Sequence, residues 1–250
     1  MNLPGFDLAH TGVTGRSARK RLIVALDYPC AGMALDAVGR LGNLVQWFKV
    51  GLELYIAEGN SFVETLRERG YSVFLDLKLH DIPNTVAGAV RSASKSGAEL
   101  LTVHAAGGPA MLSAAQEAAA GGASALKLLA VTVLTSMDAA QLDATGVFSP
   151  TSDQVLRLAG LAHEGGIRGL VASSHETARL RAAYPESTLV IPGIRPSGAH
   201  TGDQKRVGTP ASAIADGADY LVVGRPITQA ADPAAAAQAI LDEMAAAAKR

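Results

Sequence analysis

Cysteine is almost absent from this sequence: Cys30 is the only one in 250 residues. A single thiol cannot form an internal disulfide, and a metal site built from cysteines is excluded. Because disulfide-free proteins are typical of the reducing interior of the cell, we expect a cytoplasmic location. Long apolar runs are also absent, since no stretch reaches the roughly eighteen apolar residues that a membrane-spanning helix needs. Residues 1–20 lack the apolar core of a signal peptide.

An excess of charge of either sign is missing too. The sequence holds 22 basic and 23 acidic residues, for a net charge of −1. This balance provides no overall field for nucleic acid or membrane binding, so any anion site must be local. The GxGxxG signature of dinucleotide-binding sheets does not follow the first apolar segment.

Short apolar segments of β-forming residues alternate with longer alanine-rich helical segments from Leu22 onward. The apolar segments lack polar alternation, which is typical of parallel strands buried on both faces. We expect strands, each followed by a helix, at residues 21–27, 46–51, 72–78, 99–105, 126–134, 169–174, 188–193 and 219–224. This pattern favours an α/β fold, a (β/α)₈ TIM barrel, over an open doubly wound sheet. We expect residues 1–20 to form a flexible extension and residues 21–250 a single barrel domain.

The stretch 71–86, YSVFLDLKLHDIPNTV, places charged residues inside an apolar strand. Asp76 and Lys78 are two apart and therefore share a face of that strand. Pro83 suits the first turn of a helix, which places Asp81 at the strand-to-helix turn. Charges beside an apolar strand cost desolvation energy unless they pair or bind a ligand. The stretch therefore predicts a functional cluster, although an isolated Asp-x-Lys pair is more often a structural ion pair.

Functional residue types follow nearly every predicted strand. They are Asp27, Lys49, Asp76, Lys78, His104, Thr135, Ser136, Arg195, Gly224 and Arg225. The carboxyl ends of barrel strands form the active site, so we expect these residues to converge on one opening. Taken singly, each has a structural explanation: Asp27 could cap a helix, and His104 could be a satisfied core histidine. Taken together, they favour an active site.

The last two predicted strands are followed by features of a phosphate site. The loop after residues 188–193 is rich in glycine, serine and proline and ends in a Gln-Lys-Arg run. Gly224 and Arg225 follow the last strand, and loops at these two places in a barrel often bind phosphate. Glycine lets backbone N–H groups approach an anion, and a guanidinium contacts two phosphate oxygens. We expect residues 197–204 to form a lid that orders over the ligand.

Several motifs occur in an order that resembles one known family. LIVALD and FKVG precede FLDLKLHDIPNTV, and LTS, PGIRP, GDQ and VVGRPIT follow it. Together they resemble the orotidine 5′-phosphate decarboxylases from about Leu22 to Ala239. The resemblance implies a (β/α)₈ barrel that works as a homodimer without metal or organic cofactor. It also implies removal of CO₂ from C6 of orotidine 5′-phosphate to give UMP, the last step of de novo pyrimidine synthesis.

The resemblance assigns catalytic roles to four residues. Lys78 matches the proton donor to C6, and Asp76 matches the carboxylate beside the departing CO₂. Asp81 matches a residue that the partner chain contributes across the dimer interface. Lys49 completes an alternating array of charges.

Substrate contacts follow from the same resemblance. Asp27 and Lys49 match ligands of the ribose hydroxyls, and Thr135 matches the position that contacts the pyrimidine ring. Ile82 and Thr85, also from the partner chain, match positions that close the site. The phosphate-binding set is matched by Arg195, Gln204, Gly224 and Arg225, with Gln204 able to bridge phosphate and base.

Two other functions remain open at this point. Keto-gulonate-phosphate decarboxylases and hexulose-phosphate synthases resemble the same Asp-x-Lys-x-x-Asp strand, but they depend on a metal and act on sugar phosphates. Lys49 in FKVG, with PGIRP and GDQ, favours the nucleotide enzyme. A non-catalytic barrel that keeps Arg225 would bind UMP without turnover, but the intact set of Asp76, Lys78 and Asp81 argues against it.

Overall fold

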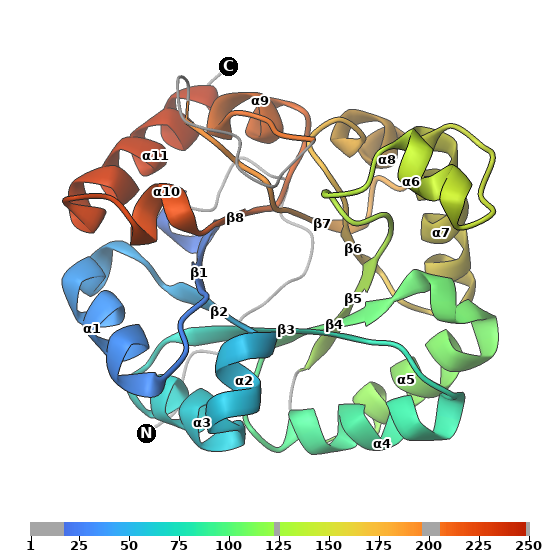
Figure 1. Cartoon of the computed structure of the whole chain (residues 1–250), viewed down its shortest axis with the longest axis horizontal. Helices are drawn as coiled ribbons and strands as arrows, with labels where there is room; N and C mark the ends of the chain where they lie inside the picture. The colour runs from blue at the N-terminus through green and yellow to red at the C-terminus, as the bar shows by residue number, and fades with distance from the viewer. Residues whose placement is uncertain (1–17, 123–125, 197–205, 249–250) are drawn as a thin grey trace.

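The computed structural model describes residues 18–122, 126–196 and 206–248. Within them the chain forms a closed barrel of parallel strands with helices around it (Figure 1). The strands are β1 (Leu22–Leu26), β2 (Trp47–Gly51), β3 (Ser72–Leu79), β4 (Leu100–His104), β5 (Lys127–Val131), β6 (Gly169–Val171), β7 (Thr188–Ile191) and β8 (Tyr220–Val223). The helices are α1 (Ala31–Leu41), α2 (Leu52–Glu58), α3 (Asn60–Glu68), α4 (Pro83–Ser94), α5 (Gly108–Ala120), α6 (Ala139–Ala144), α7 (Thr151–Glu164), α8 (Thr177–Ala183), α9 (Pro210–Ala215), α10 (Arg225–Thr228) and α11 (Pro233–Ala247).

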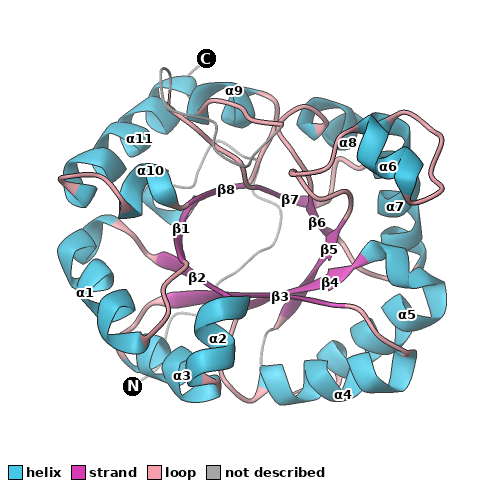
Figure 2. Ribbon diagram, viewed as in Figure 1, coloured by secondary structure: helices cyan, strands magenta, loops and turns pink. Residues whose placement is uncertain are grey.

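Each strand pairs with its neighbours in sequence, and β1 pairs with β8 to close the ring. Figure 2 shows the strands as an inner ring and the helices outside it. Two parallel strands need a connection that brings the chain back to the amino end of the barrel. The helices between the strands supply it. The predicted (β/α)₈ barrel is confirmed.

Both faces of each strand are buried, as the lack of polar alternation predicts. In β1, Leu22, Val24 and Leu26 pack with the helices, whereas Ile23 and Ala25 belong to a separate cluster inside the barrel. Trp47 and Tyr220, the first residues of β2 and β8, fill this interior with an edge-to-face contact at 5.5 Å between ring centroids. In the described part of the chain, these side chains therefore pack the amino end of the barrel interior.

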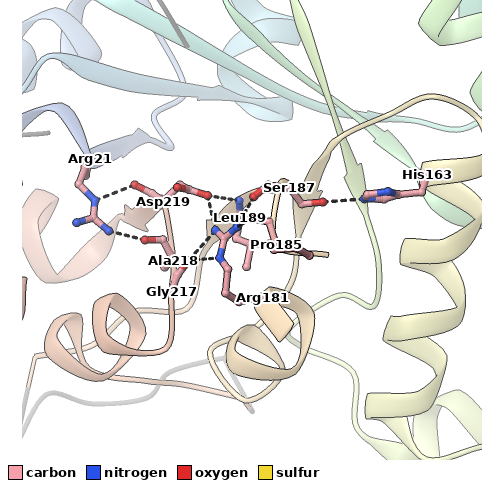
Figure 3. Close-up of polar contacts among 9 residues, drawn as sticks. All are labelled: Arg21, His163, Arg181, Pro185, Ser187, Leu189, Gly217, Ala218 and Asp219. Atoms are coloured by element: carbon pink, nitrogen blue, oxygen red, sulfur yellow. Dashed lines mark hydrogen bonds and ion pairs between the residues drawn. The ribbon is translucent and has the colours of Figure 1, made fainter. Parts of the chain in front are cut away.

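Polar side chains fasten the amino ends of β1, β7 and β8 (Figure 3). Arg21 donates to the carbonyl oxygens of Ala218 and Asp219. Arg181 forms an ion pair with Asp219, and the Asp219 carboxylate also accepts from the backbone N–H of Leu189 at 2.8 Å. We call Arg21, Arg181 and Asp219 the amino-end cluster. Because it lies at the end of the barrel away from the cavity, its contribution is to stability.

Every described strand begins within one residue of its predicted start. The predicted strands at 126–134 and 169–174 extend too far toward the carboxyl end. β5 ends at Val131 and β6 at Val171. After β5 the carbonyl oxygens of Val133 and Leu134 accept hydrogen bonds from Arg206 instead of a neighbouring strand. This departure from the sheet carries the residues after β5 toward the opening.

Two expectations fall partly outside the described residues. Residues 1–17 of the predicted extension and the whole of the predicted lid, 197–204, are not among them. Residues 18–20 form a short 3₁₀ turn before β1. Among the helices that the structure describes, none is long and apolar enough to cross a membrane.

Candidate active site

A cavity of about 530 Å³ opens at the carboxyl ends of the strands. Its polar lining residues are Asp27, Lys49, Asp76, Lys78, Thr135, Ser136, Arg195, Arg225 and Gln229, and the backbone of Gly224 also lines it. All of them except Gln229 come from strand ends that the sequence predicts to converge. The structure therefore gathers these residues around one opening.

Two lysines and two aspartates form a chain of ion pairs on the wall made by β1, β2 and β3. The Lys78 ammonium nitrogen lies 2.8 Å from each carboxylate oxygen of Asp76. The Lys49 ammonium nitrogen lies 2.9 Å from Asp27 Oδ1 and 3.5 Å from Asp76 Oδ2. Charges of opposite sign thus alternate from Asp27 through Lys49 and Asp76 to Lys78.

Burial decides how strongly these charges act. Lys49 and Asp76 are each only 9% exposed. Burial alone would lower the pKa of Lys49, but the charges of Asp76 and Asp27 outweigh it and raise that pKa. Burial would raise the pKa of Asp76, but Lys49 and Lys78, with hydrogen bonds from Lys78 and Thr102, lower it. Both groups are therefore charged at neutral pH, and Lys78 lies beside a fixed buried carboxylate.

β3 bulges where its charged residues lie. It pairs with β4 at Leu75↔Leu101 and next at Leu79↔Val103, so three residues of β3 lie opposite one residue of β4. Lys78 has a φ of 49°, and no other non-glycine residue in the described ranges has a positive φ. This backbone conformation costs a residue with a side chain about 1–2 kcal/mol, and such strain concentrates at functional sites.

The wall made by the ends of β7 and β8 carries two arginines. Arg195 follows β7 and Arg225 begins α10, and both line the cavity. Burial lowers the pKa of Arg195, and the positive charge of Arg225 lowers it further. Two guanidinium groups that repel each other beside a cavity are stabilised by a bound anion. The planar fork of N–H donors in each guanidinium matches the spacing of phosphate oxygens.

The surface between the lysine–aspartate chain and the arginines is largely apolar. It includes Phe74, Val131, Val171, Pro192 and Val222. Thr135 and Ser136 add polar groups at the edge of this surface. Such a lining favours a ligand that combines an apolar surface with polar groups.

The segment after β3 lies outside the cavity. Asp81, Ile82 and Thr85 are exposed, Ile82 to 67%, and none of the three lines the cavity. The Asp81 carboxylate accepts a hydrogen bond from the backbone N–H of Ile82 at 2.6 Å. A single chain therefore does not bring Asp81 to Lys78. Gln204, the remaining predicted site residue, lies outside the described residues.

His104, which ends β4, was also expected at the opening but does not line the cavity. Its ring instead lies beside that of His80, with 5.4 Å between centroids. Burial lowers the pKa of His104, and the charges of His80 and Lys78 lower it further. The imidazole is therefore neutral at pH 7.

Sequence reasoning missed Thr102 and Gln229. Thr102 is buried in β4 and hydrogen-bonded to both Lys78 and Asp76. The sequence feature that could have indicated Thr102 is a polar residue inside the apolar strand LLTVH. Gln229 lines the cavity one helical turn after Arg225, so the spacing GRPITQ could have indicated it.

Three or more His, Cys, Asp or Glu side chains do not come together as a metal site in the described part of the chain. The two cavity carboxylates, those of Asp27 and Asp76, are paired with lysine ammonium groups instead. The carboxylates are thus already engaged by cations that the chain supplies.

Barrels of this architecture carry their chemistry at the carboxyl ends of the strands. With its charged, partly apolar cavity at that end, the protein is a (β/α)₈-barrel enzyme, and the arginine pair points to a phosphorylated substrate. Comparison with known proteins narrows this class. The family described as "Orotidine 5′-phosphate decarboxylase / HUMPS family" matches residues 20–240.

Individual relatives agree with that match. The orotidine 5′-phosphate decarboxylase of Anaeromyxobacter sp. (strain K) is 54% identical over 222 residues, which cover 88% of this chain and 96% of the relative. That of Halorhodospira halophila is 52% identical over 228 residues, covering 91% and 97%. The crystal structure of orotidine 5′-phosphate decarboxylase from Lactobacillus acidophilus superposes with a TM-score of 0.79 at 38% identity, covering 90% of this chain and 99% of that one. The chain belongs to the orotidine 5′-phosphate decarboxylase family.

Proposed function

We propose that this enzyme decarboxylates orotidine 5′-phosphate to UMP, the last step of de novo pyrimidine synthesis, with Lys78 as the proton donor. One observation carries the proposal: the Lys78 ammonium lies 2.8 Å from both oxygens of the buried Asp76 carboxylate, at the wall of a cavity that also holds an arginine pair. Membership of the family supports the reaction. The homodimer and the cytoplasmic location belong to the same proposal.

The chemistry requires a cation at the reacting carbon. When the bond from C6 to the carboxylate breaks, CO₂ leaves and the electron pair stays on C6, in the plane of the ring, where no π system can spread it. The Lys78 ammonium stabilises this pair by its charge and then transfers a proton to C6, giving UMP. Asp76 forms an ion pair with the ammonium and orients it, and the lysine regains its proton from solvent.

The remaining lining residues bind the substrate. Asp27 and Lys49, joined at 2.9 Å, hold the ribose hydroxyls. Thr135 contacts the pyrimidine ring. The phosphate binds to Arg195, the Gly224 backbone and Arg225, with Gln204 as a further ligand. Since the phosphate lies far from the breaking bond, its binding energy serves orientation and closure of the site.

The assay for the proposed function is turnover of orotidine 5′-phosphate, followed by ultraviolet absorbance, with EDTA present. We expect full activity after EDTA treatment and no stimulation by added Mg²⁺, because lysine ammonium groups already pair with the Asp27 and Asp76 carboxylates. Binding of UMP without any turnover would refute the decarboxylase function. Activity that disappears with EDTA and returns with Mg²⁺ would refute the metal-free mechanism.

Asp81, Ile82 and Thr85 complete the site of a partner subunit in a homodimer. Their exposure beside the opening supports this, since they are available to a second chain. A heterodimer of a Lys78→Ala chain and an Asp81→Ala chain then has one site with both substitutions and one intact site. We expect it to recover about half of the wild-type activity, since a two-fold dimer has two equivalent sites.

Differently tagged chains allow this heterodimer to be purified and its activity compared with both homodimers. A matched control pairs Lys78→Ala with Asp76→Asn: both residues belong to the same chain's site, so no intact site forms and no activity returns. If the heterodimer of the Lys78→Ala and Asp81→Ala chains regains no activity, the shared-site hypothesis is refuted.

A further inference from the structure

The side chain of Thr102 lies between the two central residues of the site. It is fully buried in β4, with 0% exposure. Its hydroxyl oxygen accepts a hydrogen bond from the backbone N–H of Lys78 at 2.8 Å. The same hydroxyl donates to Asp76 Oδ1 at 3.0 Å. One small side chain thus joins the lysine's backbone to the carboxylate that pairs with the lysine's ammonium.

The bulge in β3 explains why a side chain is needed here. Between Leu75↔Leu101 and Leu79↔Val103 the ladder of β3 and β4 is interrupted, and Thr102 is the only β4 residue between the two pairings. Its side chain supplies the acceptor for the Lys78 N–H where the regular ladder does not. A buried N–H left without an acceptor would cost about 1–3 kcal/mol. The hydroxyl therefore helps to hold Lys78 at its φ of 49°.

The direction of the two hydrogen bonds is fixed. A backbone N–H can only donate, so the Thr102 oxygen accepts from Lys78 and its single hydrogen is left for Asp76. Asp76 Oδ1 then receives hydrogen bonds from both the Lys78 ammonium and Thr102. The hydrogen bond from Thr102 is one of the interactions that lower the pKa of Asp76. The carboxylate is thereby held in one orientation.

We propose that Thr102 is a positioning residue of the decarboxylation, which fixes the Lys78 backbone and the Asp76 carboxylate so that the ammonium meets C6. The inference rests on the proposed function, in which Lys78 protonates C6. Thr102 does not line the cavity, so it acts through its two partners rather than on the substrate. Its removal should therefore slow the chemical step and leave the binding of ribose and phosphate intact.

Thr102→Val tests the proposal because valine keeps the shape of threonine and removes only the hydroxyl. We expect kcat to fall by about 10- to 100-fold, since small misplacement of a reacting group has an effect of this size. KM and the Kd for UMP should change by less than about threefold, because the contacts of the substrate's ribose and phosphate remain. Thr102→Ser keeps the hydroxyl and should restore most of the lost kcat.

Thr132→Val is the matched control. Thr132 is also buried, at 4% exposure, and its hydroxyl donates to the Val171 carbonyl oxygen at 2.9 Å. It bonds to neither Lys78 nor Asp76, so this variant measures the general cost of losing a buried hydroxyl near the site. We expect its kcat to stay within about threefold of wild type.

A Thr102→Val enzyme with the kcat of Thr132→Val would overturn the proposal, as would a loss of kcat that serine does not restore. If the valine variant does not fold, serine and cysteine at position 102 provide the same comparison, since a thiol is a weak hydrogen-bonding group of similar size. Wild-type turnover, measured in the same assay, tests the proposed function separately. The two hypotheses can thus fail independently.

Discussion

Replacement of Lys78 by alanine is expected to lower kcat by roughly 10⁵-fold, because it removes both the proposed proton donor and the charge proposed to stabilise the C6 electron pair. The ammonium has no substitute within reach on its own strand. Lys49, the nearest other lysine of the chain of ion pairs, already lies 2.9 Å from Asp27 and 3.5 Å from Asp76. Single-turnover absorbance measurements at high enzyme concentration would detect the residual rate.

Lys127→Ala serves as the control for this variant. Lys127 is exposed at the first position of β5, at the end of the barrel away from the cavity, so its loss should leave kcat unchanged. The Lys78→Ala protein should still bind UMP through the arginine pair. A kcat within about tenfold of wild type would show that another group supplies the proton, since loss of the true donor has a much larger effect.

Replacement of Asp76 by asparagine is expected to lower both activity and stability. The amide cannot compensate the charges of Lys49 and Lys78, which lie 3.5 Å and 2.8 Å from the Asp76 carboxylate. Removing one partner of a buried ion pair costs about 3 kcal/mol of folding free energy. We expect kcat/KM to fall by roughly 10³-fold, because the ammonium loses the group that aims it. Urea denaturation and steady-state kinetics measure the two effects.

The stability effect should depend on pH in a defined direction. The pKa of Asp76 is lowered in the folded protein, so the carboxylate stabilises the fold above its unfolded pKa of about 3.9. That stabilisation is lost as the pH falls through the lower folded pKa. The difference in unfolding free energy between wild type and Asp76→Asn should therefore be constant from about pH 5 to 8 and shrink below about pH 4.

Asp36→Asn, an exposed aspartate on α1, is the control for this series. It should show neither the loss of activity nor the pH-dependent difference. A difference between wild type and Asp76→Asn that grows toward pH 3 would contradict the assigned charge state of Asp76.

The barrel could be predicted from the sequence because its strands are buried on both faces and read as uninterrupted apolar segments. The same reasoning placed Asp27, Lys49, Asp76 and Arg225 at one opening, since strand ends in a barrel converge whatever the loops do. The prediction of these site residues succeeded because the place of a residue at a strand end determines its place in the barrel.

The bulge in β3 could not be predicted in this way. Regular alternation already places Asp76 and Lys78 on one face, so nothing in DLK indicates that Lys78 has a left-handed backbone conformation. The role of Thr102 was hidden for the same reason, because its contacts depend on the interrupted pairing of β3 with β4. Asp81 illustrates a different limit: its position in the chain is as expected, but its proposed action requires a second chain.

The pairing of β1 with β8 has a consequence for how the enzyme is made. Arg21 bonds to residues 197 and 198 positions later in the chain, so the ring cannot close on the ribosome until β8 has emerged. The two sides of this seam also carry Asp27 and Arg225, and a side-chain carbon at Gly224 would lie 3.8 Å from the Asp27 carboxylate. The residues proposed to bind the ribose and the phosphate thus come together only when the last strand is in place. A nascent chain that lacks β8 also lacks Arg225, so the lining of the cavity cannot be complete before that strand has been synthesised.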